Sequence, residues 1–378
     1  MAEQVDIVII GGGIVGASIA HALRGRRSVI VLEQESALGY HATGRSAAEF
    51  TYRFHSALVA RLTAASSDFM RSPPEGFSGV ELLRPRGNLL IANSDKKTRL
   101  AEVLAMELAN TPDGASPVEA LSVQEAIDKV GFLDPDYVAA AFYDPDCWDV
   151  EVESLLQGYA KSARASGAEF KRDTRLIAAH RVADGWRLET NHGEIQAATV
   201  VNAAGAWADQ TATLFDVPNL QIQAMRRTAI TLKAPGYDVA PMPEVNEIDE
   251  DFYFKPDAGH LMVSPADETP VDPHDAWPED MDIAIAADYM DQCTTLEITH
   301  VAHSWAGLRT FAPDRVPVIG FSDRQPSFFW AAGVGGYGIQ TSPAVGQLAA
   351  GLLCADAFTD DAESRELLKL MSPARFGG

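Results

Sequence analysis

Cysteine is scarce in this chain of 378 residues, which holds only Cys147, Cys293 and Cys354. The three residues lie far apart and form neither a C-x-x-C pair nor a zinc-ligand spacing. This spacing argues against a disulfide framework and against a cysteine-based metal site, so we expect no bound metal. Isolated cysteines are typical of reduced, buried thiols, and we expect a cytoplasmic protein.

Basic residues are also few, since 30 Lys and Arg stand against 53 Asp and Glu and the formal net charge is −23. Proteins bind phosphate backbones with clustered cations that release counterions. The charge balance therefore argues against a nucleic-acid partner and against an anionic membrane surface. Acidity of this kind favours solubility more than any specific partner.

Long hydrophobic runs are missing as well. The apolar stretch 5–20 is interrupted by glycines, and Glu3 and Asp6 stand where a signal peptide would carry basic residues. No other stretch approaches the roughly 20 apolar residues of a membrane span. We therefore expect no integral membrane segment.

The composition that remains is that of a globular protein, with 47% hydrophobic and 22% charged residues. A chain of this length exceeds a typical single core, which favours two domains. Residues 5–10 predict a buried parallel strand, 14–23 a helix and 28–32 a second strand, as at the start of a doubly wound fold. The same pattern returns near the C-terminus, with a strand at 327–331 and a helix at 342–354.

The middle of the chain has a different character. Alternating residues predict a strand at 223–232 and a hairpin that pairs 252–255 with 260–263, without parallel crossovers. A helix is expected at 151–166, with Asp149 as its N-cap. The predicted fold class is α/β, with a Rossmann-like nucleotide-binding domain and an inserted, β-sheet-rich α+β domain for substrate. We assign 1–80, 148–220 and 313–378 to the first domain, and 81–147 and 221–312 to the second.

The first strand runs directly into GGGIVG, in which Gly11, Gly13 and Gly16 match the G-x-G-x-x-G motif. Its glycines allow a tight turn, close approach of the backbone to a pyrophosphate and close packing of the helix. The helix N-terminus then offers free N–H groups to phosphates. Glu33 follows about 20 residues later at a strand end, where its carboxylate suits a ribose diol. The motif predicts dinucleotide binding but does not choose between FAD and NAD.

Two further turns favour FAD. HATGRSAAEF at 41–50 and GGYGIQT at 335–341 are glycine-containing turns that lead into helices, so each supplies further backbone N–H groups. NAD enzymes rarely need three such turns. One extended cofactor that contacts all three segments is therefore expected.

The chain resembles the D-amino acid oxidase and glycine oxidase family of FAD-dependent oxidoreductases, and within it the bacterial D-arginine dehydrogenase type. The resemblance rests on pieces that follow one another along nearly the whole chain. In order, they are IIGGGIVGAS, GYHATGRSAA, VVNAAGAWAD, RRTAI, FYFKPDAG, WAGLRTFAPD and GGYGIQTS.

This resemblance implies an FAD whose isoalloxazine ring lies between the two domains, with its reactive N5 toward the substrate. No cysteine or histidine stands where relatives attach the flavin covalently, so non-covalent FAD is expected. The implied contacts come from the glycine loop, the second strand end, the 42–48 loop, one backbone position and the C-terminal turn. They are Gly11, Gly13, Ile14, Gly16, Glu33, Gln34, Ala42, Thr43, Gly44, Arg45, Ser46, Ala47, Ala48, Leu176, Gly335, Gly336, Tyr337, Gly338, Ile339 and Gln340.

The family also implies a pair of arginines that binds the substrate carboxylate. Arg226 and Arg227 are neighbours on a predicted strand, so they point to opposite faces and only one can reach the flavin. Against the family pattern, Arg226 is expected to bind the carboxylate together with Arg309, through the bidentate geometry of guanidinium groups. Tyr253 is expected to help fix the carboxylate or amine, and the Gly336 carbonyl to accept a hydrogen bond from the amine.

The expected reaction is hydride transfer from the Cα of a D-amino acid to flavin N5, followed by hydrolysis of the imino acid to a 2-oxo acid and ammonia. Two other interpretations stay open. One is oxidation of an N-methyl amino acid or a 2-hydroxy acid. The other is a flavin subunit that passes electrons within a larger complex.

Residues expected near the substrate side chain depart from the D-arginine type. Asn88 stands where those members have a glutamate for the guanidinium, and Phe54 where they have a tyrosine, which favours neutral side chains. Glu49 replaces a histidine and would restore a negative partner if it points inward. Met262 falls where oxidases of the sarcosine type carry an oxygen-activating lysine. We therefore expect a dehydrogenase that uses dyes or quinones as acceptors.

Overall fold

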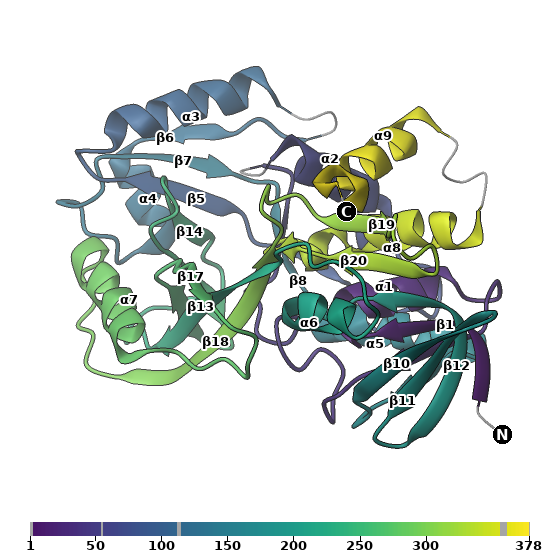
Figure 1. Ribbon diagram of the computed structural model, residues 1–378. Coiled ribbons are helices and arrows are strands. Elements are labelled where there is room, and N and C mark those ends of the chain that lie inside the picture. Colours follow the sequence, from purple (N-terminus) through teal and green to yellow (C-terminus); the bar gives the residue numbers. More distant parts are fainter. Residues whose placement is uncertain (1–2, 54–55, 112–114, 356–360, 378) are drawn as a thin grey trace.

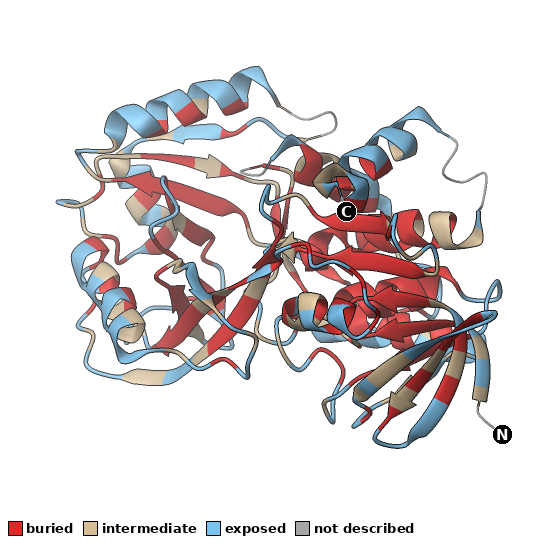
Figure 2. Cartoon of the chain, in the orientation of Figure 1, coloured by how far each residue is buried: buried red, intermediate tan, exposed pale blue. Residues whose placement is uncertain are grey.

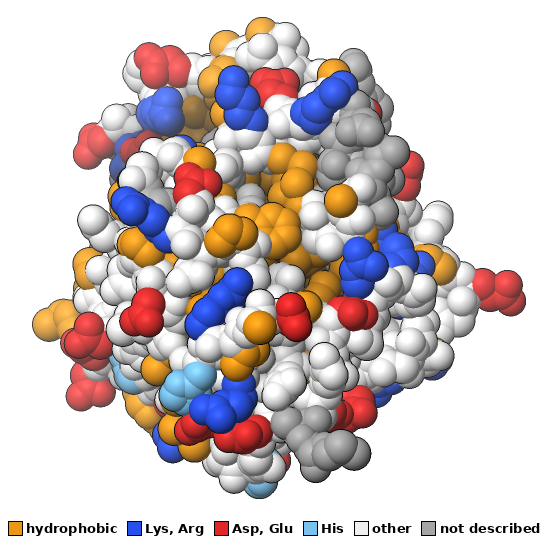
Figure 3. All heavy atoms as spheres, turned by 45° about the vertical axis from the view of Figure 1, so that its right-hand side comes forward, with side chains coloured by type: hydrophobic (Ala, Val, Ile, Leu, Met, Phe, Trp, Pro, Cys, Tyr) orange, Lys and Arg blue, Asp and Glu red, His pale blue; other side chains and the backbone are white. Residues whose placement is uncertain are grey.

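Two lobes, each built on its own β-sheet, make up the molecule (Figure 1). The computed structural model describes residues 3–53, 56–111, 115–355 and 361–377. Side chains of both charges are spread over the face seen in Figure 3, while hydrophobic side chains gather near its middle. Among the described residues, no helix has the length and apolar character that crossing a membrane requires.

The first lobe contains an eight-stranded sheet whose central strands are parallel. The main path runs β10-β11-β12-β1-β2-β9, while β20 pairs with β12 and β19 with β20. The strands are β1 (Glu3–Ile10), β2 (Val29–Leu32), β9 (Glu169–Lys171), β10 (Leu176–Val182), β11 (Gly185–Thr190), β12 (Gly193–Asn202), β19 (Val318–Phe321) and β20 (Phe328–Ala332). Both doubly wound segments expected from the sequence are therefore present.

Helices cover this sheet and bury its β-branched residues, as Figure 2 shows by the red strands at the centre of the lobe. The covering helices are α1 (Ile14–Ala22), α2 (Ala57–Arg71), α5 (Val152–Ala165), α6 (Ala208–Thr213), α8 (Gly338–Cys354) and α9 (Ala362–Met371), with the 3-10 turns Gly205–Trp207 and Pro373–Phe376. Every residue of α1 is buried, because α5 and α8 both pack against it.

The second lobe contains a ten-stranded, mostly antiparallel sheet in the order β21-β18-β13-β16-β15-β14-β5-β7-β6, with β17 paired to β13. Its strands are β5 (Asn88–Ala92), β6 (Glu119–Leu121), β7 (Ala140–Asp144), β13 (Gln223–Leu232), β14 (Glu244–Glu247), β15 (Tyr253–Asp257), β16 (His260–Ser264), β17 (Thr269–Val271), β18 (Val301–Phe311) and β21 (Val334–Gly335). Its helices are α3 (Lys97–Ala109), α4 (Val123–Val130) and α7 (Asp280–Cys293). The predicted hairpin is the β15–β16 pair.

A small sheet, β3-β8-β4, is formed by segments on either side of the predicted domain boundaries. Its strands are β3 (Glu49–Thr51), β4 (Leu83–Pro85) and β8 (Cys147–Val150). Asp149 lies on β8, so its prediction as an N-cap is wrong and Glu151 takes that place for α5. The predicted domain limits assign every strand of the two large sheets to the lobe in which it lies, except β21. The limits themselves stay a prediction.

His21 occupies an aromatic cage in the first lobe. Its ring is 3% exposed and lies 5.4 Å from Phe77, 5.7 Å from Phe69 and 5.2 Å from Tyr159, measured between ring centroids. Among the described residues, neither ring nitrogen has a hydrogen-bond partner. Burial, with a smaller contribution from Arg24, lowers the pKa of His21 to about 4.

This cage predicts acid sensitivity of the fold. The unfolded histidine takes up a proton near its usual pKa of about 6.5, but the folded one does so only near pH 4. Stability from the neutral ring is therefore complete above about pH 6.5 and is lost as the pH falls through about 4, by on the order of 3 kcal/mol. In urea unfolding of the FAD-loaded protein, His21→Leu should flatten this loss, while His300→Leu, at an exposed position, should keep it. Equal slopes in both variants would contradict the assignment.

Candidate active site

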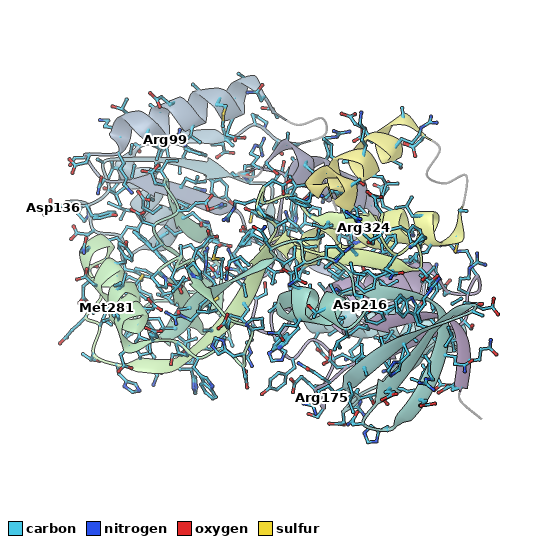
Figure 4. The ribbon with its side chains drawn as sticks, viewed as in Figure 1. Arg99, Asp136, Arg175, Asp216, Met281 and Arg324 are labelled. Atoms are coloured by element: carbon cyan, nitrogen blue, oxygen red, sulfur yellow. The ribbon has the colours of Figure 1, made fainter. Side chains whose placement is uncertain are left out.

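A cavity of about 540 Å³ runs from the carboxyl ends of β1 and β2 to one face of the second sheet. Segments far apart in the sequence line it, including the glycine loop, the 39–47 loop, residues 174–177, the end of β12 and the turn after β20. Arg175, from the segment 174–177, is seen in the lower part of the first lobe in Figure 4. The volume is within the usual range for ligand pockets.

Close backbone contacts form the inner wall of the cavity. Gly11 has φ +109°, and a Cβ there would lie 2.3 Å from the carbonyl oxygen of Ala203. A Cβ on Gly16 would lie 2.0 Å from the Gly11 oxygen. Only glycine fits at either position, so these two residues let α1 begin directly against β1 and β12.

The N-terminus of α1 faces the cavity, where the Ile14 N–H donates to Thr43 Oγ1 at 3.1 Å. Gly13 is the N-cap and has no side-chain cap, and the first turn of α1 holds no acidic residue. A Cβ on Gly13 would make an ordinary contact of 3.4 Å with Thr43 Oγ1. The positive end of the helix is thus available to an anion such as a pyrophosphate.

Glu33 lies at the end of β2 beside this loop. Its Oε2 accepts a hydrogen bond from the Gly12 N–H at 2.9 Å, and its Oε1 accepts one from the Glu35 N–H at 2.9 Å. Burial raises the pKa of the Glu33 carboxyl, while these two N–H groups oppose the rise. The fixed carboxylate lines the cavity and retains lone pairs for the hydroxyls of a ribose.

The second lobe holds the 43–47 loop in place. Arg45 donates to the carbonyls of Ala276 and Ala306 at 3.0 and 3.1 Å, and Trp305 Nε1 donates to the Arg45 carbonyl at 3.2 Å. Lys255 Nζ donates to the Ala47 carbonyl at 2.8 Å. These bonds tie the loop to the second lobe.

Arg227 and Arg309 enter the cavity from adjacent strands of the second sheet, together with Tyr253 and Met262. Gly307 stands opposite Arg227 in the β13–β18 register and leaves room beside it. Burial, and then the neighbouring Arg309, lower the pKa of the Arg227 guanidinium. Arg227 also pairs with Glu268 at 3.3 Å. Two half-buried guanidinium groups side by side disfavour each other's charge, so an anion between them would relieve the repulsion.

Gly336 completes this end of the cavity. A Cβ there would lie 3.0 Å from Nη1 of Arg309, so glycine allows that guanidinium to rest against the turn. Gly335 has φ +60° and packs on Phe311. The turn thus sets the position of Arg309 as well as lining the cavity.

The prediction that Arg226 faces the cavity is wrong. Arg226 points to the opposite face of β13, where it forms ion pairs with Glu279 and with Asp282, the latter at 2.8 Å. Asp282 lies in the first turn of α7, and Glu279 is the N-cap residue of that helix. α7 covers this face of the sheet. Alternation along the strand was predicted correctly, but the choice between the two arginines was not.

The other predicted residues are those expected to bind the cofactor and those expected near the substrate side chain. Among the cofactor residues, Gly16, Gly44, Ala48, Tyr337 and Gln340 do not line the cavity, whereas the remaining fifteen do. Gln340 instead donates to Thr63 and accepts from the Thr51 N–H. Of the side-chain residues, Asn88 is buried and accepts a hydrogen bond from Asn246 at 3.0 Å, and Glu49 lies on β3. Phe54 lies outside the described residues.

Comparison with known proteins shows to which family the chain belongs. The model of the family described as FAD dependent oxidoreductase (DAO) matches residues 6–352. The chain belongs to this family. It is 25% identical to the glycine oxidase of Geobacillus kaustophilus over 93% of this chain and 94% of that protein. It is 23% identical to human mitochondrial dimethylglycine dehydrogenase over 91% of this chain but only 42% of that protein.

Among solved structures, the L-proline dehydrogenase of P. horikoshii superposes with a TM-score of 0.82 at 23% identity, covering 100% of this chain and 99% of that one. At this identity the likeness shows the fold alone. The DAO fold and its cofactor, FAD, are therefore those of this chain. The two-lobed architecture expected from the sequence is confirmed.

The residues present fit FAD. Close glycine packing turns the N-terminus of α1 toward the cavity, where a pyrophosphate would lie, and the Glu33 carboxylate is placed for the adenosine ribose. The cavity continues from there to the second sheet. Among the described residues, no cysteine lines the cavity, and His41 in its wall is bonded to Glu35 at 3.0 Å. These features favour a cofactor held without a covalent bond.

Gly13→Val should give a folded protein without FAD. The backbone at Gly13 has φ −74° and tolerates a side chain, but a branched one would occupy the space in front of the helix N-terminus. We expect the Kd for FAD to rise by roughly 100-fold or more, measured by flavin fluorescence, with an unchanged circular dichroism spectrum.

Gly79→Val is the matched control, since a Cβ at Gly79 meets nothing within 4 Å. It should retain one FAD per chain, and heating should release that FAD intact from the wild type. Normal FAD affinity in Gly13→Val would show that the phosphates bind elsewhere, and flavin that stays with the denatured chain would show a covalent bond.

Proposed function

We propose that the protein is an FAD-dependent D-amino acid dehydrogenase that oxidises the Cα–N bond to an imino acid, which water then hydrolyses to a 2-oxo acid and ammonia. The observation that carries the proposal is the Arg227–Arg309 pair. Both guanidinium groups line the cavity that fits FAD, and Gly336 lies beside them. A pair of this kind is suited to a carboxylate bound through several N–H groups.

The protein's contribution is orientation. With the carboxylate fixed at Arg227 and Arg309, the substrate Cα has little freedom to rotate. Tyr253 and Gly336 line the same cavity, which supports a role for the Tyr253 hydroxyl in binding carboxylate or amine and for the Gly336 carbonyl in accepting from the amine. Bound FAD supplies the chemistry, accepting the two electrons and the hydrogen of the Cα–H bond as a hydride at N5.

The known relatives support an amine substrate but leave the finer choice open. Their names refer to glycine and dimethylglycine, and those of solved structures to L-proline and to L-amino acids. An N-methyl amino acid or a 2-hydroxy acid would use the same arginine pair. Anaerobic bleaching of the flavin with D-methionine, L-methionine, sarcosine and 2-hydroxyglutarate separates these candidates, and fastest bleaching by D-methionine is expected. Bleaching by none of these or other amino acids would favour an electron-transfer subunit.

Arg227→Met should lower kcat/KM by roughly 100-fold or more, because a charge-assisted bidentate contact to the carboxylate disappears. Arg226→Met is the matched control from the other face of β13. It should destabilise the fold by about 3 kcal/mol, since it leaves Glu279 and Asp282 without their partner, yet keep kcat/KM per bound flavin within a few-fold. The reverse pattern would return the substrate role to Arg226.

The expected electron acceptor is a dye or a quinone rather than oxygen. Met262 lines the cavity. The family resemblance aligns it with the oxygen-activating lysine of sarcosine-type oxidases. Lys255 stands opposite it on β15, but its ammonium is paired with Asp149 at 2.6 Å and with the Ala47 carbonyl. A neutralised cation gives little help to developing superoxide.

Oxygen consumption should therefore be far slower than dye reduction at equal substrate concentration. Met262→Lys should raise the oxygen rate relative to the dye rate, whereas Met281→Lys, on the exposed face of α7, should not. In Figure 4, Met281 is seen on that helix at the outer side of the second lobe. Comparable wild-type rates with both acceptors would contradict the prediction.

A further inference from the structure

A carboxylate outside the cavity contacts one arginine of the pair. Glu268 directly precedes β17, the short strand that pairs with β13 (Figure 1). Thr269 stands opposite Arg226 in this register, so Glu268 falls beside Arg227 and on the same face of the sheet, because side chains alternate along a strand. Its Oε1 accepts a hydrogen bond from Arg227 Nη2 at 3.3 Å. Glu268 therefore reaches an arginine that lines the cavity without lining the cavity itself.

Glu268 is fixed by a second arginine. Nη2 of Arg315 lies 2.9 and 3.0 Å from the two carboxylate oxygens of Glu268. These contacts are shorter than the 3.3 Å contact to Arg227, and Arg315 is not a residue of the cavity wall. A carboxylate with such a partner does not depend on Arg227 for a positive charge. It is a fixed anchor for Arg227 rather than a mobile group that competes with the substrate.

The backbone and an aromatic ring hold Arg315 in turn. Its φ is +60°, a conformation that residues with a side chain rarely adopt, and its N–H donates to the Ala312 carbonyl at 2.8 Å. The guanidinium lies over the ring of Phe311, with Cζ 3.8 Å from the ring centroid. Backbone strain of this kind persists only where the surrounding contacts require it.

The contacts continue from Phe311 back to the cavity. A Cβ on Gly335 would lie 2.5 Å from Phe311 Cε1, and a Cβ on Gly336 would lie 3.0 Å from Arg309 Nη1. The turn is therefore packed between the phenylalanine ring and the second arginine of the pair. One continuous series of contacts joins the two arginines of the pair, through Glu268, Arg315, Phe311 and the turn 335–336.

The arginine pair requires such support. Burial, and then Arg309, lower the pKa of Arg227, whereas Glu268 acts in the opposite direction. A long cationic side chain tends to turn away from a neighbouring cation unless an opposite charge holds it. The contact with Glu268 holds Nη2 of Arg227, while its buried Nε has no hydrogen-bond partner among the described residues.

We propose that Glu268 is a positioning residue for the substrate: by bridging Arg227 and Arg315, it holds Arg227 in the orientation in which both arginines of the pair bind one carboxylate. Glu268 acts through Arg227 and does not touch the substrate. This inference deepens the proposed function and rests on it, because it needs the substrate carboxylate at Arg227 and Arg309.

Glu268→Gln keeps the size of the side chain and removes its charge. KM for D-methionine should rise by about tenfold while kcat stays within about threefold, because the carboxylate is bound less well and the flavin is unchanged. Arg315→Met should raise KM in the same direction, and the double variant should not exceed Glu268→Gln alone. The matched control is Glu363→Gln, which removes a surface carboxylate paired with Arg61 at 2.7 Å and should leave both constants unchanged.

A double-mutant cycle separates positioning from a general structural effect. If Glu268 acts through Arg227, then Glu268→Gln should change kcat/KM by less than about twofold in an Arg227→Met background. A full loss that persists in that background would overturn the proposal. An unchanged or lowered KM in Glu268→Gln would also overturn it, since a lowered KM means that Glu268 competes with the substrate. Arg315→Met keeps the test decisive if Glu268→Gln does not fold.

Binding of propionate, followed through the flavin absorbance, tests the inference without turnover. Propionate offers a carboxylate but no amine, and its Kd should rise by about tenfold in Glu268→Gln. If no amino acid reduces the flavin but this rise is found, the proposed function fails and the role of Glu268 in carboxylate binding stands. If amino acids are oxidised and neither KM nor Kd changes, this inference alone fails. A wild type that neither oxidises amino acids nor binds propionate would overturn both.

Discussion

Contact between three backbone segments, made possible by glycine at positions 11 and 16, positions the cofactor half of the site. The loop after β1 can touch both the end of β12 and the first turn of α1 because neither glycine carries a Cβ. The N-terminus of α1 then faces the cavity, and the Gly12 N–H comes within hydrogen-bond distance of Glu33. Phosphate and ribose recognition therefore share one origin, the close packing of a strand, a turn and a helix.

The substrate half depends on the alternation of one strand. β13 sends Arg227 into the cavity and Arg226 toward the acidic start of α7, so the two guanidinium groups lie on opposite faces of the sheet. Arg226 is neutralised by fixed carboxylates and stabilises the lobe. Arg227 pairs with Glu268 at 3.3 Å but also lies beside another cation, Arg309, which lowers the pKa of its guanidinium. An anion bound between the two arginines would offset this repulsion.

Local patterns in the sequence predicted much of this structure, because β1, the glycine loop, α1 and Glu33 are neighbours in the chain and their spacing carries the information. The choice between Arg226 and Arg227 could not be made in that way. Periodicity puts the two on opposite faces, but which face is covered depends on α7, more than fifty residues later.

A substrate meets the long-range field of the protein's net charge first and the charged groups that line the cavity afterwards. The net charge of −23 gives a field that attracts cationic solutes and repels anionic ones at low salt. An acidic amino acid is disfavoured before it reaches Arg227 and Arg309, and a basic one is favoured.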